Sequence, residues 1–459
     1  GELNEIAQKE EKYFLNWIER KRKKNNDSIY WWMNQLAGRN NLSSNFFLYL
    51  CQFFFIKKYL KKRKINKICI VCENYYLQDF LYLNLKKKYK CTYLQNFFFS
   101  FFFEKVKFFV KKIIFLTKEV IKIIIQIVFA KITRPKKLYM PKKDTVLFHH
   151  CVNSFSEKIN KKKICNYFSD LPNLCEKNKK IEISSLFWTY SGFLKLKFYK
   201  SMRKKNSFIP EDWLNFFDYI KIFFNTRKIK FTLKKKLNYK ENLNINSLIN
   251  LELNEHETVS SFKFLMYIPA LKKWSNRIKK LTVFDQYQNM IFEHCLRFAC
   301  QDLKIKTKTI GYHHSLMSRG FLGYRSTKSE WESKTRPDKI FTIGKLAKKT
   351  LLSGGVPRKK IVETFSLRQQ KFKKVFQNKK NKNILLVLPL KKNLSLEICE
   401  KMMFINEKLL DLNFKIFVKT HPFLGNKELL KYLSWDKLPN NWYWSKDDLR
   451  SGLDSCYLV

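Results

Sequence analysis

The chain has little glycine, little proline and few acidic residues for its length. Its 459 residues include 11 glycines, 10 prolines and 38 Asp or Glu, against 92 Lys or Arg. The glycine patterns GxGxxG and GxxxxGK[ST] are absent, so no dinucleotide or ATP site is expected. No Asp-x-Asp motif occurs, and no zinc-finger, helix-turn-helix or RNP spacing is found. We therefore expect no metal, no cofactor and no nucleic-acid partner.

The formal net charge is +54, which would ordinarily indicate a polyanionic partner. Lysine far exceeds arginine, and phenylalanine and asparagine are also abundant. Lys, Asn, Ile and Phe are the residues of A/T-rich codons, so coding bias explains much of this charge. An anionic membrane surface is the partner that best suits the remainder.

Eleven cysteines are scattered, many of them inside apolar runs. Cys69 and Cys72 have CxxC spacing, but no second pair stands at zinc spacing. Reduced core cysteines of a cytoplasmic protein are expected. The chain begins at Gly1 without a signal peptide and stops at Val459 in an element that reads as unfinished. We expect both ends to be clipped.

The longest apolar stretch covers residues 97–132. Lys or Glu interrupts it every few residues, which argues against a transmembrane span. On a helix these charges occupy about half of the circumference. The other half comprises Val106, Phe109, Val110, Ile113, Leu116, Val120, Ile123 and Ile127. The pattern suits a helix lying on an anionic inner leaflet, and it also suits a helix whose apolar face packs on its own domain. Both readings stay open.

Strand-like and helix-like segments alternate regularly from residue 281, which predicts a parallel sheet. Earlier, an apolar run at 68–72 precedes a helix with Asn74 as candidate N-cap, and 145–151 reads as another strand. The charged stretch 371–382 reads as a linker. We predict an α/β fold of two Rossmann-like domains. Residues 1–375 form the first, with helical and basic insertions, and residues 376–459 form an incomplete second.

His313 and His314 end a predicted strand, at the edge of a parallel sheet where ligands bind. Strand side chains alternate, so the two rings are expected on opposite faces, and only one can face a cleft. A cleft histidine could take a proton from an acceptor hydroxyl or donate to a phosphate. Two structural histidines at a strand end are the alternative. His149 and His150 also end a strand and are read as structural.

The second predicted strand of the second domain ends with Lys419 and His421, just before a proline. A fixed positive charge beside an orientable imidazole suits a diphosphate, which makes these two residues candidates for donor binding.

Five further residues are candidates for the same site. Glu293 lies near a helix start, where it could orient an acceptor or take its proton, and Arg297 follows one turn later. A surface salt bridge between the two is the alternative. Arg319 and Arg368 are candidate anion contacts, and Gly344 opens a helix whose N-terminus could face a phosphate.

Sequence motifs in the middle of the chain resemble a known family. FDQYQNMIFEHCLRFACQDLKIKTKTIGYHHS is followed by RPDKIFTIG and by a strand ending in Leu367 and Arg368. These motifs resemble those of bacterial surface-carbohydrate biosynthesis proteins, which are glycosyltransferases of the GT-B fold. A Gly-Tyr-Gln-His-Ser strand, a Pro-Asp-Lys-Ile strand and a Lys-Pro-His-Pro strand mark that family. The N-terminal WWMNQLAGRNNLSSNFFLYLCQ is similar more loosely.

Three departures from the family pattern matter. His313 stands where the family more often has glutamine, which makes His314 the better match to the family histidine. Thr420 replaces the proline before His421, and the helix start with Glu293 lacks the preceding tryptophan. Capsule Kdo transferases, polysialyltransferases and teichoic-acid glycerophosphotransferases have similar two-histidine arrangements.

By this resemblance, His314 and Glu293 are catalytic residues on the acceptor side, with His313 and Arg319 as further contacts. The residues expected to bind the donor are Lys419, His421, Arg368 and Gly344. The resemblance implies a metal-independent glycosyltransferase of cell-surface polysaccharide or lipopolysaccharide assembly. Its partners would be a nucleotide sugar and a lipid-linked or glycan acceptor, and it would be peripheral on the inner membrane. A phosphoalcohol transferase and a non-catalytic basic scaffold are the alternatives.

Overall fold

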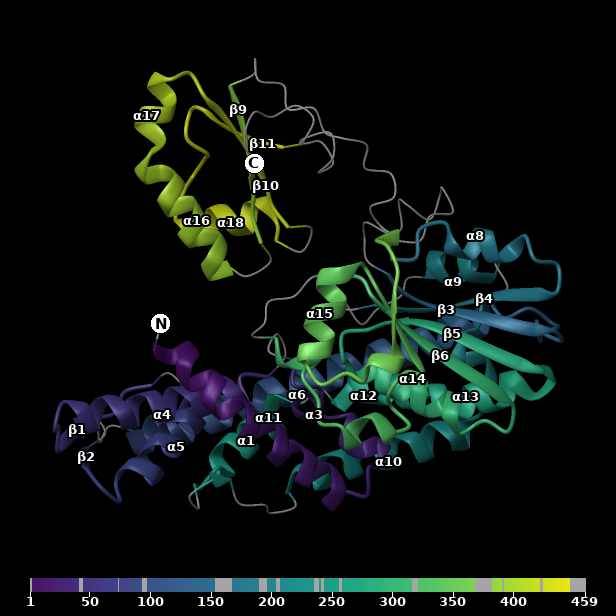
Figure 1. The fold of residues 1–459 in the computed structure, drawn as a ribbon, viewed down its shortest axis with the longest axis horizontal. Coiled ribbons are helices and arrows are strands. Elements are labelled where there is room, and N and C mark those ends of the chain that lie inside the picture. The colour runs from purple at the N-terminus through teal and green to yellow at the C-terminus, as the bar shows by residue number, and fades with distance from the viewer. Residues whose placement is uncertain are drawn as a thin grey trace. The chain divides into compact units, whose positions relative to one another are not determined.

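The chain divides into two compact units, Gly1–Arg368 (unit 1) and Gln369–Val459 (unit 2). The computed structural model describes residues 2–40, 44–72, 74–92, 97–152, 167–189, 196–203, 207–234, 239–240, 243–255, 258–315, 321–367, 382–389, 392–421 and 424–445. The linker predicted at 371–382 lies, except for its last residue, outside these ranges. Each unit is described by itself, with the element labels of Figure 1.

Unit 1 is built on a six-stranded parallel sheet (Figure 1). Its strands are β3 (Asp144–Val152), β4 (Ile181–Thr189), β5 (Lys280–Gln286), β6 (Lys306–His313), β7 (Lys339–Thr342) and β8 (Ile361–Glu363). The predicted α/β class with parallel sheets is confirmed. Only β4 lacks a counterpart in the prediction.

The order of the strands is β4-β3-β5-β6-β7-β8. The chain therefore steps from β3 outward to β4 and returns to the other side of β3 with β5. In open parallel sheets, ligands bind beyond the carboxyl ends of the strands, next to such a reversal. A site is thus expected at the carboxyl ends of β3 and β5, which flank the reversal.

Helices cover both faces of this sheet. The strand period of two sends Val146 and Phe148 toward Phe168, near α8 (Leu171–Glu176), while Leu147 joins the main core. The face that carries Leu147 is covered by α13 (Tyr267–Trp274) and α14 (Ile291–Gln301). Another helix, α15 (Lys345–Ser353), connects β7 to β8.

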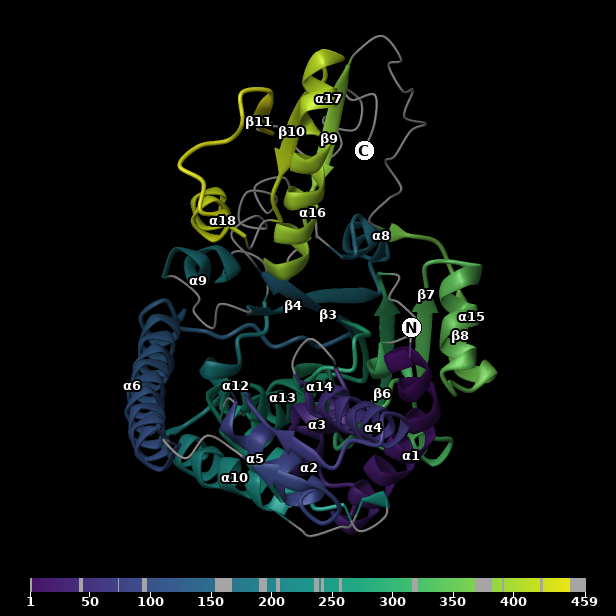
Figure 2. The same ribbon diagram turned by 90° about the vertical axis from the view of Figure 1, so that its left-hand side faces the viewer.

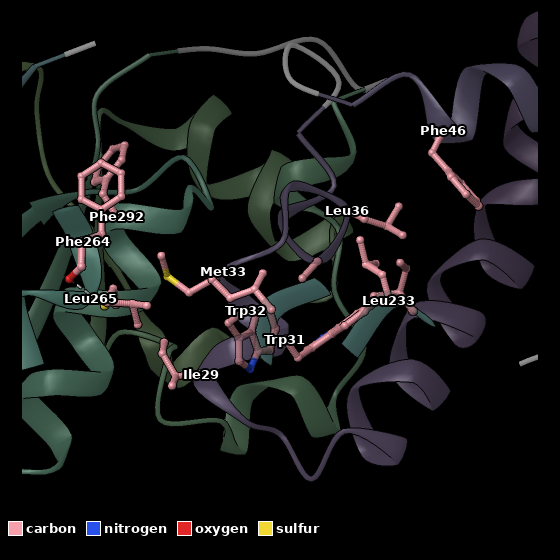
Figure 3. Packing of buried hydrophobic residues seen from close by; sticks show 14 of the residues in the cluster. Ile29, Trp31, Trp32, Met33, Leu36, Phe46, Leu233, Phe264, Leu265 and Phe292 are labelled. Carbon is pink, nitrogen blue, oxygen red and sulfur yellow. Dashed lines mark hydrogen bonds between the residues drawn. The ribbon is translucent and has the colours of Figure 1, made fainter. Parts of the chain in front are cut away.

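The main core of unit 1 extends beyond the sheet into helices from the N-terminal and middle parts of the unit. These helices are α1 (Glu2–Lys24), α2 (Ile29–Trp32), α3 (Gln35–Gly38), α4 (Phe46–Lys62), α10 (Phe216–Lys234), α11 (Asn246–Glu255) and α12 (Thr258–Leu265). Helix α9 (Leu196–Arg203) packs in a separate, smaller cluster that includes Ala130. Trp31 and Trp32 of α2 are completely buried. Figure 3 shows them between Leu233 on one side and the Phe264 and Phe292 rings on the other. Truncating a buried aromatic of this kind typically costs about 3–5 kcal/mol.

The predicted strand and helix near residue 70 exist but do not join the large sheet. Strand β1 (Lys67–Cys69) pairs in parallel with β2 (Lys90–Thr92), and α5 (Tyr75–Leu85) connects them. Asn74 caps α5 as predicted, because its Oδ1 accepts a hydrogen bond from the Leu77 N–H at 3.2 Å.

The amphipathic stretch forms one helix, α6 (Phe97–Ile132). Four members of its expected apolar half, Val106, Val110, Ile113 and Val120, are exposed to solvent. The helix instead packs through a different arc that includes Ala130, which is fully buried. In the part of the chain that the structure describes, no helix is long and apolar enough to cross a membrane.

Unit 2 contains a three-stranded parallel sheet of order β11-β10-β9. Its elements are β9 (Asn383–Val387), α16 (Lys392–Phe404), α17 (Asn406–Asp411), β10 (Lys415–Lys419), α18 (Asn426–Leu433) and β11 (Trp442–Trp444). Ile405 separates the two helices α16 and α17. Ser395 lies buried inside α16, where its Oγ donates to the Pro389 carbonyl at 2.8 Å.

Candidate functional site

The two candidate histidines occupy the carboxyl edge of the sheet at the end of β6. Their rings have different neighbours: His313 lies near Tyr287 and Tyr324, whereas His314 lies near Tyr167 and Tyr312. The expected placement on opposite faces is confirmed. The two histidines therefore belong to two separate environments.

His314 is 8% exposed and sits where the ends of β5 and β6 meet. Its Nε2 lies 3.0 Å from the side-chain Nε2 of Gln288, two residues beyond β5. An amide N–H can only donate, so with this amide orientation Nε2 of a neutral ring accepts and Nδ1 carries the proton. The Tyr167 ring packs edge-on at 4.6 Å between centroids. Nearby on β5, Gln286 pairs in register with Tyr312.

Glu293 is completely buried in the first turn of α14. Its carboxylate accepts hydrogen bonds from the backbone N–H of Gln288 at 2.8 Å and of Asn289 at 3.0 Å. Arg297 Nη2 donates to the same carboxylate at 3.1 Å. Burial raises the pKa of Glu293, and Arg297 with the two backbone N–H groups opposes that rise. The carboxylate therefore fixes the loop that carries Gln288.

Arg297 joins this carboxylate to a second one on β5. Its Nη2 donates to Asp285 Oδ1 at 2.8 Å and to the Gln286 carbonyl at 2.9 Å. Arg297, Asp285 and Glu293 are all completely buried. The ion pair between Glu293 and Arg297 therefore exists, but the alternative that it lies on the surface is wrong. A buried pair that loses one partner leaves an uncompensated charge.

A further buried network attaches the N-terminal helices to the same loop. Asn289 donates to the Gly38 carbonyl at 2.8 Å and accepts from Arg336 Nη1 at 2.8 Å. Glu330 binds Arg39 at 2.7 Å and also pairs with Arg336. His294 completes the network, with its Nδ1 3.0 Å from the Trp32 carbonyl oxygen and its Nε2 2.7 Å from Asn289 Oδ1. One face of the site is thus a rigid floor of paired charges.

His313 is fully buried on this floor side. Neither ring nitrogen has a hydrogen-bond partner among the residues that the structure describes. The Tyr324 ring lies 4.5 Å away, and burial lowers the pKa of His313 to about 4. His313 is consequently neutral in the folded protein at physiological pH.

Gly344 is the N-cap of α15, just beyond β7. Its φ of 119° is a conformation that favours glycine, and a Cβ built there would have nothing within 4 Å. The start of α15 is therefore open. A helix start carries a partial positive charge and free N–H groups, as an anion contact requires.

In unit 2, Lys419 is the last residue of β10 and His421 follows two positions later. Both lie at the carboxyl edge of that sheet, as predicted. The His421 carbonyl accepts a hydrogen bond from the Leu424 N–H at 2.8 Å, and partial burial lowers the pKa of the His421 imidazole.

Arg319 and Arg368 lie outside the described residues. Within the described ranges, no group of three or more His, Cys, Asp or Glu side chains is placed to hold a metal ion. His149 and His150 contact the Tyr267 hydroxyl at 3.3 Å and the Ser185 hydroxyl at 3.2 Å, respectively.

Sequence reasoning missed several residues of this edge. They are Arg39, Tyr167, Asp285, Gln288, Asn289, Glu330 and Arg336. A signal existed for three of them, because Asp285, Gln288 and Asn289 are polar residues at or just beyond the end of an apolar strand. Arg39, Tyr167, Glu330 and Arg336 come from distant segments that only the fold brings together.

Comparisons with known proteins give no family assignment. No protein-family profile matches the chain, and no curated protein matches it. Among solved structures, the S. aureus MnaA-UDP co-structure is similar to this chain at 12% sequence identity and a TM-score of 0.31. The alignment covers 66% of this chain and 68% of the chain in that structure. A TM-score this low does not show a shared fold.

Proposed function

We propose that this protein is a GT-B-type glycosyltransferase that moves a sugar from a nucleotide-activated donor to a lipid-linked or glycan acceptor in cell-surface polysaccharide or lipopolysaccharide assembly. The motif resemblance between residues 284 and 368 supports the class. The observation that carries the proposal is the position of His314 at the carboxyl end of β6, one strand away from the strand-order reversal, where it contacts Gln288 just beyond β5.

His314 is the proposed base for the acceptor hydroxyl. Its Nε2 is occupied by the Gln288 amide, so the acceptor hydroxyl displaces that amide and gives its proton to Nε2. The acceptor oxygen then bonds to the anomeric carbon of the donor sugar. The bond from that carbon to the phosphate oxygen breaks, and the nucleotide leaves with the electron pair.

Glu293 has a positioning role in this proposal. Both of its oxygens are bonded by the chain itself, through Gln288, Asn289 and Arg297. Glu293 therefore acts on His314 indirectly, by fixing the loop on which Gln288 stands.

Lys419 and His421 of unit 2 are the proposed donor contacts. A lysine ammonium and an imidazole N–H offset the negative charge that develops on the departing phosphate. The open start of α15 at Gly344, together with Arg368, would supply further anion contacts in unit 1. His313 and Arg319 remain predicted acceptor-side contacts, although the burial of His313 favours a structural role.

Donor binding and turnover test the proposal directly. Isothermal titration with UDP-, GDP- and CMP-activated sugars and with CDP-glycerol should identify one donor that binds the full chain. Lys419→Ala and His421→Ala should each weaken its binding at least tenfold. Lys415→Ala, at the opposite end of β10, is the matched control and should leave binding unchanged.

The same experiment separates the alternatives. Selective binding of CDP-glycerol would favour a phosphoalcohol transferase. Absence of binding to every donor, with tight and salt-sensitive binding to DNA, would favour a non-catalytic basic scaffold. Donor binding that survives both Lys419→Ala and His421→Ala would remove these residues from the site.

A further inference from the structure

The outer face of α10 carries large apolar side chains in water. Its exposed apolar residues are Phe216, Phe217, Ile220, Phe223, Phe224 and Phe231. Phe216 is 71% exposed and Phe217 is 77% exposed. On a helix these six residues occupy an arc of roughly 120°, and the buried Ile222, Ile229 and Leu233 lie on the opposite side. The face gathers six exposed large apolar side chains, of a kind that usually marks a binding site.

Positive charges are interleaved with these rings. Lys221, Arg227, Lys228 and Lys234 of α10 are exposed, and the Arg227 guanidinium lies over the Phe224 ring at 5.2 Å. The single acidic residue of the helix, Asp218, is neutralised by Lys273 at 2.5 Å. The surface therefore offers apolar rings and cations together.

A second exposed apolar stripe runs along α6. Its described members are Val106, Val110, Ile113, Ile114, Val120, Ile121, Ile124, Val128 and Ile132, all between 43% and 68% exposed. They too fall within an arc of roughly 120°. The buried Gln126 and Ala130 lie on another side of the helix. Figure 2 shows α6 on the outside of unit 1.

The two helices meet at one end. Lys131, next to the last residue of α6, donates through Nζ to the carbonyl of Leu214 at 3.3 Å, two residues before α10 begins. This hydrogen bond brings the C-terminal end of α6 close to the start of α10, where Phe216 and Phe217 are its most exposed rings.

The chemistry of this surface favours a lipid bilayer over other partners. A second copy of the chain would also carry a formal charge of +54 and would be repelled. Single-stranded nucleic acid needs aromatic rings along its whole track, whereas the described α6 stripe is made of Val and Ile. Aliphatic and Phe side chains beside Lys and Arg suit the boundary between acyl chains and anionic headgroups.

We propose that the outer faces of α6 and α10 form a docking surface for an anionic membrane, with the two helices lying in the interface. This inference does not depend on the transferase activity. It predicts that α10 contributes both apolar insertion and charge, and that α6 contributes apolar contact along its exposed stripe.

Vesicle flotation of the full chain tests the proposal. Vesicles of phosphatidylcholine with about one third phosphatidylglycerol should bind the protein at least tenfold better than phosphatidylcholine alone. Lys221→Gln with Arg227→Gln should weaken binding roughly 25-fold, at about fivefold for each charge. Phe216→Ser with Phe217→Ser, and separately Ile114→Ser with Ile121→Ser and Ile124→Ser, should each weaken binding about tenfold or more.

Phe404→Ser is the matched control, since Phe404 of unit 2 is 91% exposed and lies on neither helix. It should bind vesicles like the unaltered protein. Because every altered side chain is exposed, circular dichroism should show unchanged folding. The proposal is overturned if the unaltered chain ignores anionic vesicles, if the α10 variants bind as well as the control, or if single-stranded DNA displaces the protein through the same residues.

Discussion

The two faces of the sheet at the end of β6 differ in what surrounds neighbouring histidines. On the His313 side, the ring is sealed against Tyr324 above a floor of paired charges that includes Arg297. On the His314 side, the ring meets the Gln288 side chain, which can exchange its hydrogen bond for one to a ligand. Adjacent residues of one type can thus serve stability and chemistry separately, because a strand sends alternate side chains to opposite faces.

The largest expected effect comes from breaking the floor. Arg297→Met leaves Asp285 and Glu293 buried without their shared cation, and we expect a loss of about 3–5 kcal/mol in the unfolding free energy of unit 1. Hydrogen exchange of β5 and β6 amide groups during urea unfolding measures it. Lys401→Met, at an exposed ion pair of unit 2, is the control and should have no measurable effect. A loss below about 1 kcal/mol would show that the floor is not a stabilising network.

The second effect separates the two histidines by function. If His314 is the base, His314→Asn should lower nucleotide release from the donor by roughly 10²–10⁴-fold while donor affinity stays unchanged. His313→Asn should retain much more activity, since its ring is sealed away from the edge. Equal losses in both variants, measured in folded protein, would erase the distinction between the faces.

The third effect is a pH dependence of stability on the sealed face. His313 has a pKa of about 4 when folded and an ordinary histidine pKa of about 6.5 when unfolded, so only the unfolded state binds a proton between these values. The stabilisation that comes from keeping His313 neutral is fully present above pH 6.5 and is lost as the pH falls toward 4. At pH 5 the unfolding free energy of unit 1 is therefore lower than at neutral pH by about 2 kcal/mol. In His313→Asn the unfolding free energy of unit 1 should therefore depend less steeply on pH. An unchanged slope would contradict the assignment.

The smallest effect concerns the amide that holds His314. Gln288→Ala removes one hydrogen bond to Nε2, and we expect about a tenfold loss of turnover. Gln288→Glu should instead shift the acidic limb of the pH–rate profile to higher pH, because a carboxylate stabilises the protonated imidazole. An unshifted profile would place Gln288 outside the reaction.

The sequence predicted the strands well where apolar runs and turns alternate strictly, as from β5 to β8. It missed β4, whose run IEISSLFWT lies in a lysine-rich region of weak periodicity. For α6 the sequence left open whether the apolar half packs on its own domain, and four members of that half are exposed. That choice depends on neighbours such as Phe198 and Tyr199, which are distant in the sequence.

The candidate site was predictable only in part for the same reason. His313, His314 and Glu293 follow from strand and helix ends. Their different roles depend on Gln288, which holds one ring, and on Arg39 and Arg336, which close the other face. A pattern along the chain carries no information about pairs separated by nearly 300 residues.

Those long separations constrain how the protein is made. Gly38 accepts from Asn289, 251 positions later, and Arg39 pairs with Glu330, 291 positions later. A side chain at Gly38 would meet the Asn289 carbonyl oxygen at 2.5 Å, so this contact is as close as backbone allows. During synthesis the first helices, with their buried tryptophans, emerge long before these partners exist. Unit 1 cannot complete its fold until Arg336 has left the ribosome, and its nascent chain must keep an apolar N-terminal segment unaggregated until then.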